Sequence, residues 1–253
     1  MIRPAHAAIL LAALLAACAS APERGPALSN LEVHFPTPFS VAAWRDGLPE
    51  GWRIYRLLRF KPLTKYEPVL DGGTPVVHAK AFSSVSGIES AVNIDLHAYP
   101  VVEWRWRVPK LIENADNTQP ATADAPARVI FTFEGGRESL PPHEQLNYDL
   151  AKAFTGNTLP YATLMYIWEP DRNEGDIITH YNSTRVKMVI AGNSTRDLAR
   201  WHDMKFNVLE DFRRAFGEEP PRIKTVGIMS DSDATGSSVE AYFGDIRFLP
   251  KDQ

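Results

Sequence analysis

The residues best suited to ligand chemistry in this 253-residue chain alternate along one short segment, from Val102 to Val108. A period of two places successive side chains on opposite faces of a β-strand. Trp104 and Trp106 would then share one face, and Arg105 would lie on the other. Two indoles can form a flat platform for a sugar ring, and a row of guanidinium groups can bind an anion. The alternative is that both tryptophans are core residues, because large aromatic side chains on one strand face are usually buried.

A carboxylate and a guanidinium stand four residues apart at the start of another apolar run, at Asp124 and Arg128. A bidentate pair between such groups can fix a loop or bind a ligand. Tyr161 supplies a further aromatic ring that can stack on a sugar face. We therefore treat these three residues, together with Trp104, Arg105 and Trp106, as candidate ligand-binding residues.

Asp231 and Asp233 directly follow an apolar, strand-like segment. Clustered carboxylate oxygens favour hard cations such as Ca²⁺. The spacing matches the first half of an EF-hand loop, but Tyr242 stands where that loop requires a glutamate, which excludes an EF-hand. Asp231, Asp233 and Asp245 remain candidates for a calcium site of lower coordination. The alternative is a hairpin in which the Asp and Ser side chains cap their own backbone.

Evidence for catalysis is weaker. The sequence contains no G-x-S-x-G motif, and Ser86-Gly87 has the composition of an ordinary turn. The seven histidines show no HxxxH or HxH spacing, which argues against zinc. A polysaccharide hydrolase with paired carboxylates remains an alternative. Its acid and base would come from the set Glu103, Asp124, Asp231 and Asp245.

The N-terminus predicts export. Arg3 precedes a small and apolar run that ends at Cys18 and is too short to span a bilayer. The residues Leu15-Ala16-Ala17-Cys18 resemble the lipobox of bacterial lipoproteins, which implies lipidation of the Cys18 sulfur and attachment to a membrane. A buried N-terminal helix is the alternative. Ala19, which would be the second mature residue, resembles the signal for the outer membrane, so we expect a cell-envelope protein that faces the periplasm.

Composition sets further limits on partners and organisation. Cys18 is the only cysteine, so no disulfide can form within the chain. The net charge of −4 leaves no basic stripe for nucleic acid. We expect a signal peptide at 1–17, a flexible tether at 18–30 and one folded domain at 31–253.

Short β-branched or aromatic segments bounded by turn residues dominate the rest of the chain. The predicted strands are Trp52–Leu58, Val76–Ser83, Ala91–Leu96, Val101–Val108, Ala127–Glu134, Ala162–Trp168, Arg185–Ala191, Thr225–Ser230 and Ala241–Leu249. Helical spacing predicts helices at Glu144–Phe154 and Trp201–Phe216, the second ending at Gly217. Strands that do not alternate with helices predict a mainly β fold, an antiparallel β-sandwich of jelly-roll type with two helical insertions.

The order of these segments resembles a bacterial family known as domain of unknown function 3047. The resemblance rests on Val102-Glu103-Trp104-Arg105-Trp106, Asp124-Ala125-Pro126-Ala127-Arg128, Leu159-Pro160-Tyr161-Ala162, Met165-Tyr166-Ile167-Trp168, Gly227-Ile228-Met229-Ser230-Asp231-Ser232-Asp233 and Tyr242-Phe243-Gly244-Asp245-Ile246. The family implies a fold and no activity. The final Gly-Asp-Ile also resembles the end of jelly-roll carbohydrate-binding modules.

These observations favour a lipid-anchored, non-catalytic envelope protein that binds a glycan or another envelope component. Two alternatives remain. The first is the polysaccharide hydrolase described above. The second is an assembly lipoprotein whose segment Trp201–Phe216 packs against an envelope protein through an exposed apolar patch.

Overall fold

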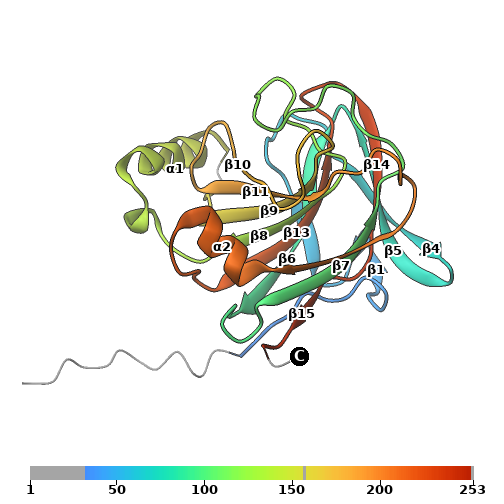
Figure 1. The fold of residues 1–253 in the computed structure, drawn as a ribbon, viewed down its shortest axis with the longest axis horizontal. Helices are drawn as coiled ribbons and strands as arrows, with labels where there is room; N and C mark the ends of the chain where they lie inside the picture. The colour runs from blue at the N-terminus through green and yellow to red at the C-terminus, as the bar shows by residue number, and fades with distance from the viewer. Residues whose placement is uncertain (1–31, 156–157, 252–253) are drawn as a thin grey trace, which may run out of the picture. The chain divides into compact units, whose positions relative to one another are not determined.

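Two β-sheets face each other across an aromatic core in the computed structural model, which describes residues 32–155 and 158–251 (Figure 1). The seven-stranded sheet has the order β10 (Ile177–Thr179), β11 (Val186–Gly192), β9 (Ala162–Trp168), β8 (Arg128–Phe133), β13 (Ile223–Asp231), β6 (Val85–Ile94) and β3 (Trp52–Tyr55). The six-stranded sheet has the order β12 (His202–Asn207), β7 (Val101–Arg107), β14 (Ser238–Phe243), β5 (Thr74–Phe82) and β4 (Lys65–Asp71), with β15 (Arg247–Leu249) paired to β7. The predicted β-sandwich is confirmed.

Strand pairing is antiparallel except between β9 and β11, which run parallel. A short hairpin of β1 (Trp44–Arg45) and β2 (Leu48–Pro49) precedes β3. Each of the nine predicted strand segments overlaps at least one observed strand. The segment Ala241–Leu249 divides into two strands, because β14 and β15 pair with different stretches of β7.

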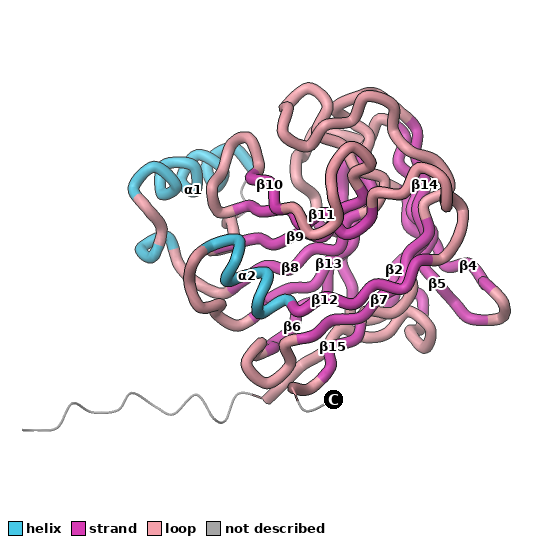
Figure 2. Tube along the Cα trace, in the orientation of Figure 1, coloured by secondary structure: helices cyan, strands magenta, loops and turns pink. Residues whose placement is uncertain are grey.

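Helices make up a small part of the fold, as the tube in Figure 2 shows. They are α1 (Pro142–Thr155), α2 (Val208–Phe216) and a 3₁₀ turn, η2 (Arg137–Ser139). The helix predicted at Glu144–Phe154 is confirmed as α1.

The predicted helix Trp201–Phe216 is wrong over its first half. Residues His202–Asn207 form β12, which pairs antiparallel with β7. Asn207 then begins α2 as its N-cap by accepting a hydrogen bond from the Glu210 backbone N–H at 3.2 Å. The helical spacing persisted across this boundary because Phe206 in the strand and Phe212 in the helix both pack on the same core. Gly217 ends the helix at φ 72°, as predicted.

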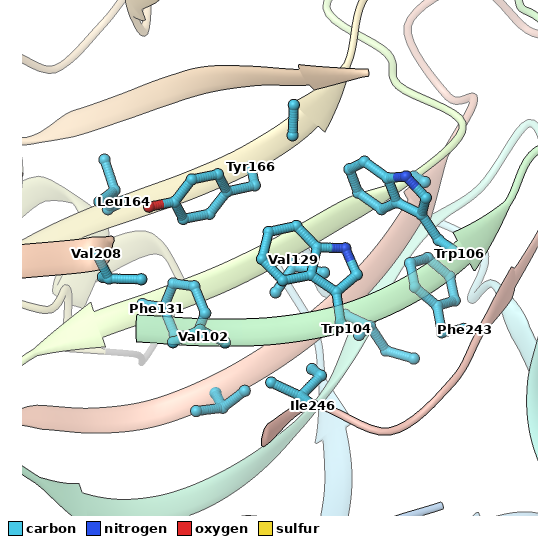
Figure 3. Packing of buried hydrophobic residues seen from close by; sticks show 14 of the residues in the cluster. Val102, Trp104, Trp106, Val129, Phe131, Leu164, Tyr166, Val208, Phe243 and Ile246 are labelled. Carbon is cyan, nitrogen blue, oxygen red and sulfur yellow. The ribbon is translucent and has the colours of Figure 1, made fainter. Parts of the chain in front are cut away.

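Side chains that point between the sheets form the core. Trp104 and Trp106 of β7 meet Tyr166 of β9 and Phe131 of β8 there, with Val102 alongside (Figure 3). The ring centroids of Trp104 and Tyr166 lie 5.2 Å apart. Every second residue of these strands therefore points into the core.

The predicted signal peptide, tether and lipidated Cys18 lie outside the described residues. Among the helices of the described residues, none has the length and apolar character needed to cross a membrane.

Candidate functional site

The outer face of the seven-stranded sheet, which points away from the core, carries a groove of about 760 Å³. We call it the outer groove. Strands β9, β8, β13, β6 and β3 contribute its floor, α1 forms part of its wall, and loop residues that include 57–58, 61 and 180–183 line its edges. The elements that build it are thus far apart in the sequence.

Two glycines flatten the middle of the floor. Gly87 of β6 and Gly227 of β13 belong to neighbouring strands and both line the groove. A Cβ on Gly87 would lie 2.9 Å from the Ile228 carbonyl oxygen, so this position needs glycine. A glycine inside a strand often marks close approach of a ligand or of another backbone. Here the Met229 Cε lies 3.3 Å from the same Cβ position, so the methionine side chain packs against Gly87.

Apolar side chains cover most of the rest of the floor. A buried cluster consists of Val85, Ile130 and Met229, and the partly buried Tyr55, Leu57 and Met165 pack against it. All six line the outer groove. The floor is therefore mostly apolar.

A buried ion pair defines the polar end of the groove. The Arg128 Nε donates to Asp231 Oδ1 at 2.7 Å, and Nη2 donates to Asp231 Oδ2 at 2.9 Å. The same Nη2 donates to Asn117 Oδ1 at 2.7 Å. The Met188 sulfur, 3.5 Å away, is the only partner of Nη1 within residues 32–155 and 158–251. Arg128 thus pairs with Asp231, rather than with Asp124, and joins β8 to β13.

Asp124 fixes the loop after β13 instead. Its Oδ2 accepts from the Thr235 backbone N–H at 2.7 Å and from the Thr235 hydroxyl at 2.6 Å. Its Oδ1 accepts from the Ala234 N–H at 3.1 Å. The Asp124 side chain therefore pins this loop.

Three carboxylates approach one another at this end. Single oxygens of Asp124, Asp231 and Asp233 all lie within 4.8 Å of one another. Protein donors already engage each side chain: Arg128 binds Asp231, Thr235 binds Asp124, and the Lys61 ammonium lies 3.0 Å from Asp233. A cation here would have to displace these donors. Asp245, the third member of the predicted calcium site, is not in this cluster.

His180 and Tyr181 stand beside the ion pair with unused hydrogen-bonding groups. Their ring centroids lie 4.1 Å apart, and 44% of Tyr181 is exposed. His180 Nδ1 accepts from the Asn182 N–H at 3.4 Å, which leaves Nε2 as the N–H donor of the neutral ring. Burial lowers the pKa of His180, which favours that neutral form. Neither Nε2 nor the Tyr181 hydroxyl bonds to another residue of the described chain.

The predicted tryptophan platform requires correction. Trp106 is 0% exposed and Trp104 is 4% exposed, because both indoles point between the sheets (Figure 3). A buried indole offers no ring face to a ligand, so the core interpretation applies to both.

Arg105, Glu103 and Asp245 lie in a second pocket of about 620 Å³ beside β7 and β12. Lys205 Nζ lies 3.0 Å from Glu103 Oε1. Ser40 donates its N–H to Asp245 Oδ1 at 2.9 Å and its hydroxyl to Oδ2 at 2.6 Å. The structure therefore separates these three residues from Arg128, Asp231 and Asp233, which line the outer groove.

Tyr161 joins neither group. Its hydroxyl donates to Glu218 Oε1 at 2.9 Å, and the Arg185 guanidinium lies 4.2 Å from its ring centroid. The Tyr161 side chain therefore packs against Glu218 and Arg185 of the same protein.

Sequence reasoning missed the floor of the groove and the pair His180 and Tyr181. Gly87 carried a usable signal. Ser86-Gly87 was interpreted as a turn, but both residues lie inside β6. A glycine within a β-branched run can mark a bare sheet surface.

Three solved structures are similar to this chain over most of its length. The xyloglucanase domain of NopAA from Sinorhizobium fredii, in complex with cellobiose, has a TM-score of 0.40 at 7% identity and covers 84% of this chain and 92% of its own. A family 30 carbohydrate-binding module of a Clostridium thermocellum cellulosomal cellulase has a TM-score of 0.35 at 11% identity. The match covers 87% of this chain and 98% of the module. The cellulose-induced protein Cip1 has a TM-score of 0.33 at 10% identity, and the match covers 78% of this chain and 90% of Cip1.

No curated protein matches the sequence. A family model described as a protein of unknown function, DUF3047, matches residues 50–247. Since the match spans most of the chain, this protein belongs to the DUF3047 family.

Proposed function

We propose that this chain is a non-catalytic binding protein of the cell envelope, and that its outer groove takes a glycan-bearing envelope component. One observation carries the proposal: a groove of about 760 Å³ ends at polar groups that no other residue of the described chain uses. Ligand sites are typically concave, mostly apolar and equipped with a few well-placed polar groups.

The polar end suits a sugar. The half-exposed Tyr181 ring can stack on the apolar face of a pyranose. His180 Nε2–H and the Tyr181 hydroxyl can bond to sugar hydroxyls, and the Arg128 Nη1 offers a further donor beside them. Buried pairing with Asp231 holds Arg128 in place, so little ordering is needed when the ligand binds.

The carboxylates of the groove support binding better than hydrolysis. Glu144 accepts from the Thr184 N–H, the Thr184 hydroxyl and the Ser183 hydroxyl, and Glu89 pairs with Arg53. Asp231 is held by Arg128. A glycosidase needs one carboxyl that can donate a proton and another that can attack or activate water. Each of these groups is instead committed to a protein donor.

Assembly through the segment Trp201–Phe216 has less support, because that segment already packs against its own domain. Val208 and Phe212 of α2 are 0% exposed, and both belong to the main core. The apolar face of α2 is therefore buried against the rest of the domain.

Attachment to the membrane through lipidated Cys18, at the periplasmic face of the outer membrane, completes the proposal. Labelling of cells with an alkyne palmitate tests it. The full chain should incorporate label into the membrane fraction, and Cys18→Ser should abolish the label. Equal labelling of both forms would contradict the anchor.

Binding of residues 19–253 to peptidoglycan fragments, lipopolysaccharide and soluble polysaccharides tests the groove. Tyr181→Ala should weaken saturable binding by tenfold or more. Phe82→Ala is the matched control, since this ring on β5 is 77% exposed and lies outside the groove. If neither variant affects binding, or no compound binds folded protein, the proposal fails.

A further inference from the structure

We infer that the ligand of the outer groove is an uncharged amphiphile, with a sugar head at the polar end and an aliphatic chain along the apolar floor. This inference rests on the proposed function and specifies its ligand class. It starts from the difference between the two parts of the groove.

The floor is poorly suited to a second sugar. Five of its side chains, at Leu57, Val85, Ile130, Met165 and Met229, offer no hydrogen-bond donor. The Thr132 and Thr225 hydroxyls, which also line the groove, bond to each other at 2.6 Å. Sugar hydroxyls placed over the five apolar side chains would lose water without gaining partners, which is unfavourable. Flexible thioethers and aliphatic groups adapt well to a methylene chain.

The dimensions of the floor suit such a chain. The apolar side chains cross five neighbouring strands, from Met165 on β9 to Tyr55 on β3. Strands lie about 4.8 Å apart, so four intervals span about 19 Å. A ten-carbon chain has nine bonds of about 1.5 Å and cannot exceed about 14 Å. Gly87 and Gly227 add no side chain of their own midway along this path.

The rims extend this apolar surface outwards. On one side, Leu58 and Lys61 line the groove, and Phe60 between them is 79% exposed. On the other side, Leu150 of α1 lines the groove and is 45% exposed. Exposed apolar side chains at the edge of a groove typically mark an interaction site.

The charges at the polar end favour an uncharged head. The guanidinium of Arg128 is neutralised by Asp231, and the ammonium of Lys61 by Asp233. Asp124 adds a further negative charge nearby. An anionic head would meet no unpaired cation among these groups, whereas sugar hydroxyls can bond to His180 and Tyr181.

Calorimetric titration with maltose and with hexyl, octyl and decyl maltoside, each below its micelle concentration, tests the inference on residues 19–253. Each buried methylene should tighten binding about fourfold, so that octyl maltoside binds about 15-fold more tightly than hexyl maltoside. Met165→Gln, a half-buried floor variant of similar length, should reduce this dependence on chain length. Met204→Gln, at a half-buried methionine in the second pocket, should leave it unchanged.

Circular dichroism first establishes that each variant is folded. Affinity that does not change with chain length overturns the inference, and so does a chain-length dependence that Met165→Gln leaves intact. Absence of binding by every alkyl maltoside also overturns it. The proposed function fails separately, when the glycan panel gives no binding that Tyr181→Ala weakens.

Discussion

The two sheets turn contrasting outer faces to solvent. On the six-stranded sheet, Arg105 stacks 4.4 Å above the Trp201 ring, and Arg107 lies 4.1 Å from the Tyr242 ring centroid. His78 then stacks on Tyr242 with ring centroids 4.1 Å apart. We call these five residues the charged ladder. Each aromatic ring in it contacts a side chain of the same protein.

The seven-stranded sheet has fewer charged and aromatic groups on its outer face, yet it holds the larger groove. Its floor consists mostly of glycine residues and of aliphatic or methionine side chains, where the other sheet has arginine and tyrosine. His180 and Tyr181 keep hydrogen-bonding groups that no other described residue uses. The face proposed to bind the ligand is therefore the one with unused polar groups and open space, rather than the one richer in aromatic and charged residues.

The largest expected effect concerns the ion pair beneath the polar end. Asp231→Ala leaves the Arg128 guanidinium buried without its carboxylate, and should lower the free energy of unfolding by about 3–5 kcal/mol. Arg53→Ala breaks the pair with Glu89, in which the Arg53 side chain is 70% exposed, and should cost less than about 1 kcal/mol. Urea denaturation measures both. Equal costs would refute the structural role given to Arg128.

Trp106→Ala probes the core that underlies both faces. Removal of this fully buried ring should cost about 3–5 kcal/mol, through lost burial and the cavity left behind. Trp106→Phe should retain most of that stability and should not alter glycan binding. A folded Trp106→Phe variant that loses binding selectively would restore the platform interpretation.

Trp201→Ala tests whether the charged ladder stabilises the fold or binds the ligand. Its ring contacts Arg105 and Arg107, and its Nε1 donates to Asp71 at 2.6 Å. We expect a loss of about 1–2 kcal/mol on thermal unfolding. Binding in the outer groove should stay within twofold of the unchanged protein. A larger loss of binding would place the ligand on this face.

A smaller effect should appear in the pH dependence of stability. Burial raises the pKa of Glu169, whose carboxylate accepts from the Asn117 side-chain amide at 2.5 Å. The folded state therefore holds this proton more tightly than the unfolded chain does. The resulting stability is fully present below the ordinary pKa of 4.5 and is lost as pH rises through the folded-state pKa.

Glu169→Gln keeps an oxygen acceptor for Asn117 and removes the buried charge. It should raise the melting temperature at pH 7 and leave it unchanged at pH 4. Glu174→Gln, at an exposed position in the turn before β10, serves as the control. If Glu169→Gln stabilised the protein equally at pH 4 and pH 7, that result would contradict the burial of a charged Glu169.

Sequence patterns predicted the fold better than the site, for a physical reason. Alternation along Val102–Val108 follows from burial of one strand face, so it identified β7 and the residues that share its inner face. It could not tell a covered face from an open one. That difference depends on β9, which lies across the core and contributes Tyr166.

The outer groove depends on contacts between distant segments. Arg128 and Asp231 are separated by 103 positions, and no local spacing links them. Asp124 stands nearer in sequence to Arg128, yet its oxygens bind the backbone at 234–235. Gly87 and Gly227 become a floor only because β6 and β13 are neighbours.

Methionine methyl NMR tests the central claim most directly. Met165 and Met229 line the outer groove, whereas Met204 lies in the second pocket. During titration with decyl maltoside, or with the best binder from the glycan panel, the methyl signals of Met165 and Met229 should shift while that of Met204 stays in place. A shift of Met204 alone would show that the ligand binds elsewhere and would contradict the account.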